Sequence, residues 1–301
     1  MTALEKLRNV KEFLTGLGID DANREAELII SHCLGVDRVM LYKDNPDVPR
    51  DAILEIDRFI RRREKREPIQ YILGYADFCG LKIRVGRGVL VPRPETELLV
   101  EEAVRTIRRE ESGEKGSSLY ASRFTHLRIL DLCTGSGCIA LALAKAFPDA
   151  LVYGTEISEI AIGYANKNAE TNGIRNVRFL KGNLFEHVQE KLETQNSYPK
   201  FDLIVSNPPY IKSEDIKNLQ PEVREWEPAE ALDGGEDGLN YYRMIIPVAG
   251  NYLGDHGFLI LEIGINQAWE IKEMARDAGF QKISVKKDYA GIERILIAEK
   301  E

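Results

Sequence analysis

From about residue 128 onward, short apolar segments alternate with longer amphipathic segments, and this alternation restricts the fold more than any other feature. The apolar segments are rich in β-branched residues and too short for helices, so we expect strands. Strands that alternate with helices form a doubly wound parallel sheet, whereas the last two, with no helix between them, indicate an antiparallel hairpin at its edge. The predicted strands are 128–132, 151–155, 177–181, 201–206, 258–263, 282–286 and 294–298.

The fourth of these strands runs directly into Asn207-Pro208-Pro209-Tyr210. Ligands of open α/β sheets bind beyond the carboxyl ends of the strands, so this tetrapeptide is expected at a binding site. Each proline removes a backbone N–H, and Asn207 is held extended by the proline after it. The side-chain carbonyl of Asn207 and a backbone carbonyl then lie side by side, which suits the two donors of a planar –NH2 group. Tyr210 adds a face for stacking; a rigid turn with a packed tyrosine is the alternative.

A glycine-containing loop, residues 131–140, follows the first predicted strand. Gly135 and Gly137 allow a tight turn and close approach of a ligand, and the next helix begins with free N–H groups. Glu156 ends the next strand, about 20 residues further on, where a carboxylate can accept both hydroxyls of a ribose. The loop therefore predicts a nucleoside cofactor, although its spacing also satisfies the nicotinamide-dinucleotide pattern, and a purely structural turn is the alternative.

The tetrapeptide separates the two cofactor classes. A dehydrogenase needs a proton donor or acceptor beside the hydride, and here only Tyr210 is a weak candidate. A methyl donor needs a positioned nucleophile, which a cradle for an –NH2 group provides. Asp131, in front of the glycine loop, can neutralise a cationic or amino group. S-adenosylmethionine is therefore the favoured cofactor.

Composition narrows the partners and the compartment. The chain has 301 residues, a formal net charge of −8 and a pI of about 5.3, which argues against binding dominated by nucleic-acid phosphates. The four cysteines and four histidines show no zinc spacing, so no metal site is predicted. Free thiols, no signal peptide and no membrane-spanning run together predict a cytoplasmic protein that does not bind membranes.

Residues 1–74 are predicted to form a small helical domain, because apolar residues recur there at helical spacing. Asp21 is a candidate cap for the second helix, and Gly18 and Gly35 are candidate ends for the first two. The third helix carries a basic face, which is either simply solvated or a docking surface for an acidic partner. Its members are Arg58, Arg61, Arg62, Arg63, Lys65 and Arg66.

The rest of the chain divides into a linker and a larger domain. Residues 75–92 alternate weakly and contain several glycines, which predicts a β-hairpin between the two domains. Residues 93–301 would form the cofactor-binding domain. Within it, the polar and glycine/serine-rich stretch 110–127 is predicted to be a flexible loop.

Several of these stretches together resemble the release-factor glutamine methyltransferases, the HemK/PrmC family. The tetrapeptide alone is shared with adenine-N6 methyltransferases, but Pro92-Arg93-Pro94 together with a helical amino-terminal domain is much narrower. The likeness covers nearly the whole chain. Its motifs lie at residues 68–74, 90–97, 131–140, 207–210, 227–232, 234–239, 261–264 and Gln267.

The resemblance implies a Rossmann-like class I methyltransferase sheet and transfer of a methyl group from S-adenosylmethionine, leaving S-adenosylhomocysteine. The acceptor would be the side-chain nitrogen of the glutamine in the Gly-Gly-Gln motif of peptide-chain release factors, and the amino-terminal helices would help to dock that protein. An adenine-N6 nucleic-acid methyltransferase and a non-catalytic module that binds translation factors stay open as alternatives. No direct nucleic-acid binding is expected.

Residue roles follow from the same resemblance. Two positions depart from the family pattern: Cys133 stands where glycine is frequent, and Asn183 stands where an acid often receives the adenine amino group. Leu184 would pack on the adenine. The implied catalytic residues are Asn207, Pro208 and Tyr210. The implied cofactor-binding residues are Asp131, Cys133, Thr134, Gly135, Ser136, Gly137, Glu156, Asn183, Leu184 and Asn207. The implied substrate-binding residues are Asn207, Pro208, Pro209, Tyr210 and Arg93.

Overall fold

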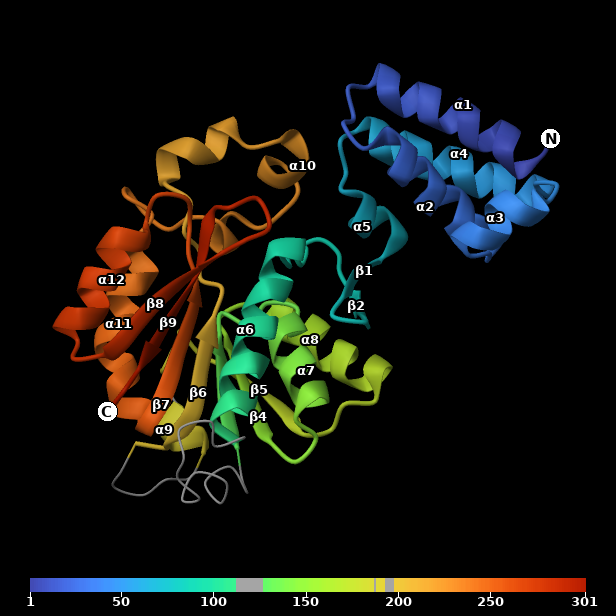
Figure 1. The fold of residues 1–301 in the computed structure, drawn as a ribbon. Helices are drawn as coiled ribbons and strands as arrows, with labels where there is room; N and C mark the ends of the chain where they lie inside the picture. The colour runs from blue at the N-terminus through green and yellow to red at the C-terminus, as the bar shows by residue number, and fades with distance from the viewer. Residues whose placement is uncertain (112–126, 187, 193–197) are drawn as a thin grey trace. The chain divides into compact units, whose positions relative to one another are not determined.

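A computed structural model of the chain describes residues 1–111, 127–186, 188–192 and 198–301 (Figure 1). The chain forms two compact units. The helical unit comprises Met1–Tyr75 and Gln220–Trp226, and the sheet unit comprises Ala76–Leu219 and Glu227–Glu301. Most of the loop predicted at 110–127 lies outside the described residues. The domain boundaries predicted from the sequence, 1–74, 75–92 and 93–301, stay a prediction.

The helical unit confirms the small all-helical amino-terminal fold. Its first helix begins with a capping box, in which the Thr2 side chain accepts from the N–H of Glu5 and the Glu5 carboxylate accepts from the N–H of Thr2. Asp21 occupies the cap position of the second helix, but its side chain makes no capping hydrogen bond. Two short helices, α3 and α5, have no clear periodic signal in the sequence. The helices are α1 (Ala3–Gly16), α2 (Ala22–Leu34), α3 (Arg38–Asp44), α4 (Arg50–Glu64), α5 (Ile69–Leu73) and α10 (Pro221–Arg224).

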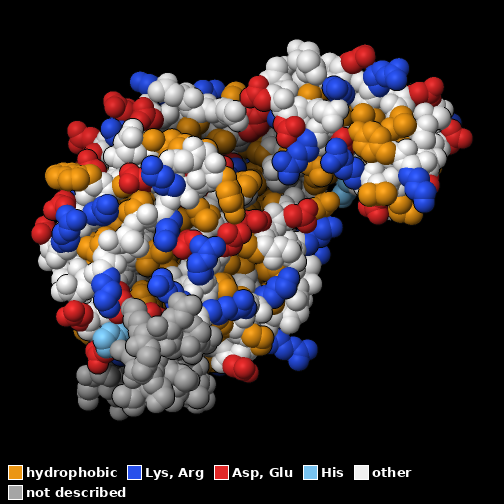
Figure 2. Space-filling view, viewed as in Figure 1, with side chains coloured by type: hydrophobic (Ala, Val, Ile, Leu, Met, Phe, Trp, Pro, Cys, Tyr) orange, Lys and Arg blue, Asp and Glu red, His pale blue; other side chains and the backbone are white. Residues whose placement is uncertain are grey.

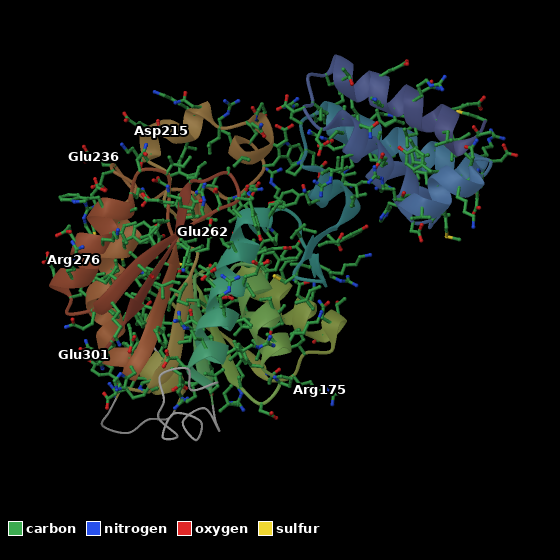
Figure 3. All side chains as sticks on the ribbon, in the orientation of Figure 1. Arg175, Asp215, Glu236, Glu262, Arg276 and Glu301 are labelled. Atoms are coloured by element: carbon green, nitrogen blue, oxygen red, sulfur yellow. The ribbon has the colours of Figure 1, made fainter. Side chains whose placement is uncertain are left out.

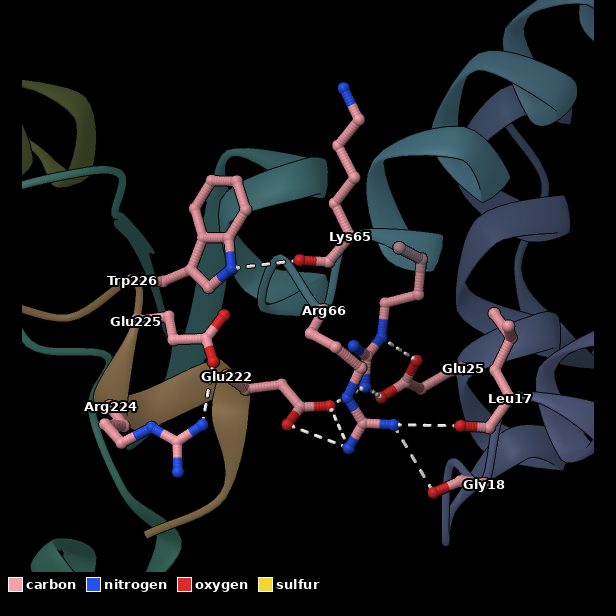
Figure 4. Close-up of polar contacts among 10 residues, drawn as sticks. Leu17, Gly18, Glu25, Lys65, Arg66, Glu222, Arg224, Glu225 and Trp226 are labelled. Carbon is pink, nitrogen blue, oxygen red and sulfur yellow. Dashed lines mark hydrogen bonds and ion pairs between the residues drawn. The ribbon is translucent and has the colours of Figure 1, made fainter. Parts of the chain in front are cut away.

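The segment Gln220–Trp226, from the far half of the chain, belongs to the helical unit through a buried ion cluster (Figure 4). Arg63 of α4 donates to Glu25 of α2 at 2.6 Å and to Glu222 of α10 at 2.7 Å. Arg66 also donates to Glu222, at 3.0 Å. The side chain of Arg63 is only 4% exposed, so its charge is matched within the protein and not by solvent.

This cluster corrects the predicted basic face of α4. Arg63 is buried and Arg66 is half-buried against Glu222, so neither belongs to a free outward surface. Arg62 is also half-buried and pairs with Glu67. Arg58 and Arg61 are exposed. Half of the predicted basic face is thus internal structure, because Glu25 and Glu222, which are distant in the sequence, reach Arg63 and Arg66, and the nearby Glu67 reaches Arg62.

Among the described residues, the main sheet of the sheet unit has seven strands in the order β5-β4-β3-β6-β7-β9-β8. The first five in this order are parallel, and β9 is antiparallel to both of its neighbours. This arrangement confirms the doubly wound sheet with an antiparallel hairpin at one edge. The strands are β3 (Arg128–Leu132), β4 (Leu151–Glu156), β5 (Val177–Lys181), β6 (Phe201–Ser206), β7 (Leu253–Glu262), β8 (Gln281–Lys287) and β9 (Glu293–Glu299).

Helices cover both faces of this sheet (Figure 1). One face carries α6 (Pro94–Glu111), α7 (Cys138–Ala146) and α8 (Glu159–Asn172); the other carries α11 (Asn240–Tyr252) and α12 (Ala268–Asp277). The predicted hairpin is confirmed as a two-stranded sheet. The stretch between β6 and α11 contains short helices. These remaining elements are β1 (Tyr75–Phe78), β2 (Leu81–Arg84), α9 (Val188–Lys191), η1 (Ser213–Asn218) and η2 (Ala229–Ala231).

The register of the central strands brings three chain segments to one edge of the sheet. Leu132 pairs with Ser206, and Ser206 pairs with Leu261, so β3, β6 and β7 end side by side. The residues just beyond the ends of β3 and β6 are Cys133 and Asn207, beside the last residue of β7, Glu262. Ligands of parallel α/β sheets bind beyond the carboxyl ends of the strands, so this edge is where a ligand is expected.

Surface charge is mixed in each unit. On the face shown in Figure 2, acidic and basic side chains are interspersed among neutral ones. Among the described residues no helix has the length and apolar character to cross a bilayer.

Candidate active site

A pocket of about 500 Å³ opens in the sheet unit at the carboxyl ends of the strands. This volume lies in the range of small-molecule and cofactor sites. Four predicted site residues do not line the pocket, although they lie close in sequence to residues that do: Asp131, Gly137, Pro208 and Tyr210. The predicted site residues that line it are Arg93, Cys133, Thr134, Gly135, Ser136, Glu156, Asn183, Leu184, Asn207 and Pro209.

The glycine loop holds the carboxylate of Glu156 at the pocket. The N–H groups of Gly135 and Ser158 each donate to Glu156, both at 2.9 Å. Gly135 has a φ of +55°, and a Cβ there would meet no atom nearer than 4.0 Å, so this glycine faces open space. Glu156 keeps lone pairs for further donors, such as the two hydroxyls of a ribose.

Gly137 is a glycine for a different reason. Its φ is +80°, and a Cβ would lie 2.8 Å from the ring of Phe179 and 3.1 Å from Ala165. The absence of a side chain at this position therefore allows the first turn of α7 to pack on β5 and α8. The loop spacing predicts both glycines, but only Gly135 borders the pocket.

Two buried acceptors near the loop have no partner within the part of the chain that the structure describes. One carboxylate oxygen of Asp131 accepts from the Thr134 hydroxyl at 2.5 Å and from the N–H of Ala140 at 3.1 Å, while Oδ1 is left unpaired. The Thr155 hydroxyl is also unpaired and lines the pocket. Burial raises the pKa of Asp131 to about 7, although these hydrogen bonds act to lower it. Of these two groups only the Thr155 hydroxyl lines the pocket, where it can hydrogen-bond to a ligand.

Cys133, the first residue after β3, adopts a φ of +57°. This left-handed conformation is unfavourable for a residue with a side chain, which gives a physical reason why glycine is frequent here. Burial raises the pKa of the Cys133 thiol well above its usual value, so the thiol stays protonated. On the opposite wall, Asn183 and Leu184 line the pocket, and the Leu184 side chain is buried there.

Asn207 lies where β6 ends, and its side-chain amide is held from one side only. The amide nitrogen donates to the hydroxyl of Thr96, in the first turn of α6, at 3.0 Å. No hydrogen bond from the described residues reaches the amide carbonyl oxygen, and Asn207 lines the pocket. The side chain therefore offers its acceptor to the pocket while its donors are partly engaged elsewhere.

Tyr210 is fixed at both its hydroxyl and its backbone. The hydroxyl donates to Glu262 at 3.1 Å, and the side-chain amide of Gln267 donates to the Tyr210 carbonyl at 3.1 Å. A Cβ on Gly238 would lie 2.5 Å from the same carbonyl oxygen, so the backbone approaches closely there. Burial and the Glu262 charge raise the pKa of Tyr210 well above its usual value, which makes this hydroxyl a donor and not a base.

Arg93 lines the pocket and is held there by Glu227, a buried acid that the sequence did not predict to be a site residue. Arg93 donates to Glu227 at 2.6 Å, and the N–H of Val91 donates to the other oxygen of Glu227 at 3.0 Å. Glu227, like Thr96 and Glu262, lies in a stretch that resembles the family. The sequence does not predict its contacts with Val91 and Arg93, because these residues lie more than a hundred positions away.

The strand order, the pocket at the strand ends and the glycine loop define a class I methyltransferase fold. A solved structure of a methyltransferase from Pyrococcus furiosus aligns with a TM-score of 0.50 at 21% identity, over 73% of this chain and 89% of that one, and supports the fold alone. Family models for the PrmC N-terminal domain and for a methyltransferase domain match residues 5–74 and 124–234.

Two relatives narrow the class to a family. A release factor glutamine methyltransferase of Thermodesulfovibrio yellowstonii is 45% identical over 100% of this chain and 99% of its own length. Another, of Geobacter sulfurreducens, is 44% identical over 94% of this chain and 92% of its own length. The chain belongs to the release factor glutamine methyltransferase family, as the sequence motifs predicted.

Proposed function

We propose that this protein transfers a methyl group from S-adenosylmethionine to the side-chain amide nitrogen of the glutamine in the Gly-Gly-Gln motif of peptide-chain release factors. The observation that carries the proposal is the Asn207 amide, whose nitrogen is bound to Thr96 and whose carbonyl is left for the pocket. A carboxamide –NH2 has two donors and needs acceptors of this kind.

The pocket suits S-adenosylmethionine. Glu156 would accept the ribose hydroxyls, Asn183 and Leu184 would contact the adenine, and Gly135 would allow close approach of the backbone. The buried carboxylate of Asp131 does not line the pocket and would act on the positive charge of the ligand through space. We assign Cys133, Thr134, Ser136 and Gly137 to the shape of this loop. When bound, the cofactor supplies an electrophilic methyl group on a sulfonium.

The protein's own contribution is orientation and charge placement. A carboxamide nitrogen is a poor nucleophile because its lone pair is delocalised. The Asn207 carbonyl and the Pro208 backbone carbonyl would accept its two N–H bonds and aim the nitrogen, with Pro209 and Tyr210 bounding the cradle. Positive charge that builds on the nitrogen would face these two carbonyl dipoles. Tyr210 cannot serve as a base, since its hydroxyl donates to Glu262. The proton that the methylated nitrogen loses would therefore pass to solvent.

Partner choice follows from the helical unit and from the charge of the chain. We assign the docking of an acidic protein surface to the exposed Arg58 and Arg61 of α4, and we place Arg93 against the substrate backbone. The net charge of −8 disfavours nucleic acid as the substrate. The four cysteines are free thiols, in keeping with the cytoplasmic location that we propose.

One assay separates this activity from the alternatives. Methyl incorporation from S-adenosylmethionine is measured on an intact release factor, a short Gly-Gly-Gln peptide, RNA and DNA side by side. We expect labelling of the glutamine in the intact factor, weak labelling of the peptide and none of the nucleic acids. Labelling of adenine instead would support an adenine-N6 methyltransferase. Release-factor binding without labelling of any substrate would support a non-catalytic module.

A further inference from the structure

We infer that Thr96 and Glu262 are positioning residues that fix which way round the Asn207 side-chain amide points. This inference rests on the proposed function, in which the Asn207 carbonyl accepts from the substrate amide. Glu262 lies at the end of β7, beside the first turn of α6 that carries Thr96 (Figure 3).

The orientation matters because a side-chain amide has an acceptor on one arm and donors on the other. Rotating the Asn207 amide by half a turn exchanges the two arms with almost no change in shape. In the wrong orientation its –NH2 would face the –NH2 of the substrate, donor against donor. A site that depends on this acceptor therefore needs a way to exclude the flipped form.

The Thr96 hydroxyl supplies the first half of that selection. It donates its single hydrogen to Glu262 at 2.7 Å, so only its lone pairs are left to face Asn207 at 3.0 Å. Lone pairs accept from the amide nitrogen and repel the amide oxygen. As long as the hydroxyl hydrogen points to Glu262, the Asn207 carbonyl is directed away from Thr96.

Glu262 keeps the hydroxyl hydrogen in that direction. Its carboxylate is 1% exposed and accepts at both oxygens, from Thr96 at 2.7 Å and from Tyr210 at 3.1 Å. Within the described residues it forms no ion pair; Arg294 acts on it only as a nearby charge and pairs with Asp288. Burying a carboxylate with only hydroxyl partners is unfavourable, so stability alone gives no reason for it. An obligate acceptor at this point does give a reason, because it fixes the direction of both hydroxyls.

The test is a double-mutant cycle with Thr96→Val, which keeps the shape of the side chain and removes the hydroxyl. In the native background we expect kcat to fall roughly tenfold, since the amide loses its preferred orientation. The KM for S-adenosylmethionine should stay within about twofold, and Thr96→Ser should restore most of kcat. In an Asn207→Ala background, Thr96→Val should change kcat little, because there is no amide left to orient.

The outcomes are distinct. An equal fall in kcat in both backgrounds would mean that Thr96 acts on packing, and no fall in the native background would mean that it does nothing for turnover; either result overturns the inference and leaves the proposed function standing. If Asn207→Ala itself leaves kcat unchanged, both the inference and the proposed mechanism fail. Should Thr96→Val not fold, Thr96→Ala replaces it: this variant also removes the hydroxyl, so kcat should again fall only where Asn207 is present.

Discussion

Two glutamates, half-buried Glu222 in the helical unit and buried Glu262 in the sheet unit, have charged groups that are stabilised in opposite ways. Glu222 of the helical unit is 13% exposed at its side chain and lies between Arg63 and Arg66. Burial acts to raise its pKa, but its backbone hydrogen bond and these two guanidinium groups bring the pKa below the usual value. Glu262 of the sheet unit has hydroxyl partners only, and burial raises its pKa despite them.

The opposite pKa shifts of Glu222 and Glu262 indicate that the first stabilises the fold and the second serves the site. A carboxylate whose pKa is lowered by matched charges contributes stability, whereas one whose pKa is raised by burial is held at a cost that the rest of the fold must offset. Strongly perturbed groups of the second kind gather at functional sites. Asp131 and Glu227, which adjoin the same pocket region, also have raised pKa values because they are buried.

Of the substitutions considered, removal of the Asn207 side chain should have the largest effect on kcat. Asn207→Ala keeps β6 and both prolines but deletes the acceptor. We expect kcat to fall roughly 100-fold or more, the usual scale for one preorganised polar contact, while affinity for S-adenosylmethionine changes far less. Steady-state kinetics and calorimetry measure the two quantities, and a thermal melt that matches the native protein is the control for folding.

A substitution at Glu156 tests the cofactor-binding part of the pocket. Glu156→Ala should weaken S-adenosylmethionine binding by about 1–3 kcal/mol, the scale of hydrogen bonds to a charged group. The matched control is Glu159→Ala, an exposed carboxylate paired with Lys181 that does not line the pocket. Titration calorimetry also tests NAD, which should not bind. Binding of NAD without S-adenosylmethionine would contradict the cofactor assignment.

Glu222 tests the structural half of the comparison. Glu222→Gln should lower the free energy of unfolding by about 1–3 kcal/mol, because Arg63 loses a charged partner, and should leave cofactor binding unchanged. A lowered carboxyl pKa contributes stability above the usual value of about 4.3, and this contribution is lost as pH falls through the lowered pKa. The difference between native and variant protein should therefore shrink in acid.

The control for this variant is Glu225→Gln, which breaks a surface pair with Arg224 and should change stability by less than about 1 kcal/mol. Urea unfolding at neutral and acidic pH gives both comparisons. Equal destabilisation by the two variants would show that the buried cluster contributes no more than an exposed pair.

Exposed arginines should give the smallest effect. Reversing Arg58 and Arg61 to glutamate should slow methylation of an intact release factor a few-fold at low salt, with the difference lost at high salt. The matched control is the reversal of two exposed charges on α1, Arg8→Glu with Lys11→Glu. If the reversal leaves the rate unchanged at low salt, this face of α4 is merely solvated.

The sequence predicted features that depend on local patterns, and it did not predict contacts between segments that are distant in the chain. Strand alternation and glycine spacing are local signals, and they predicted the sheet, the hairpin and the part of the pocket wall formed by the glycine loop and Glu156. Ion pairs between distant segments are not local, so Arg63 read as one residue of an exposed basic face although it is buried against Glu25 and Glu222. The contact between Thr96 and Glu262, which spans 166 positions, was hidden in the same way.

The most direct test of the central claim, that Asn207 acts as an acceptor and not as a turn residue, is the single-turnover rate of methyl transfer to a release factor by the native protein, Asn207→Asp and Asn207→Ala. Aspartate keeps an acceptor, but it has no N–H for Thr96 and adds a charge near Glu262, so it should be intermediate. We expect the rates to follow the order Asn, Asp, Ala, with the native rate roughly 100-fold or more above that of the alanine variant. A folded Asn207→Ala protein that transfers methyl groups at a near-native rate would contradict this claim.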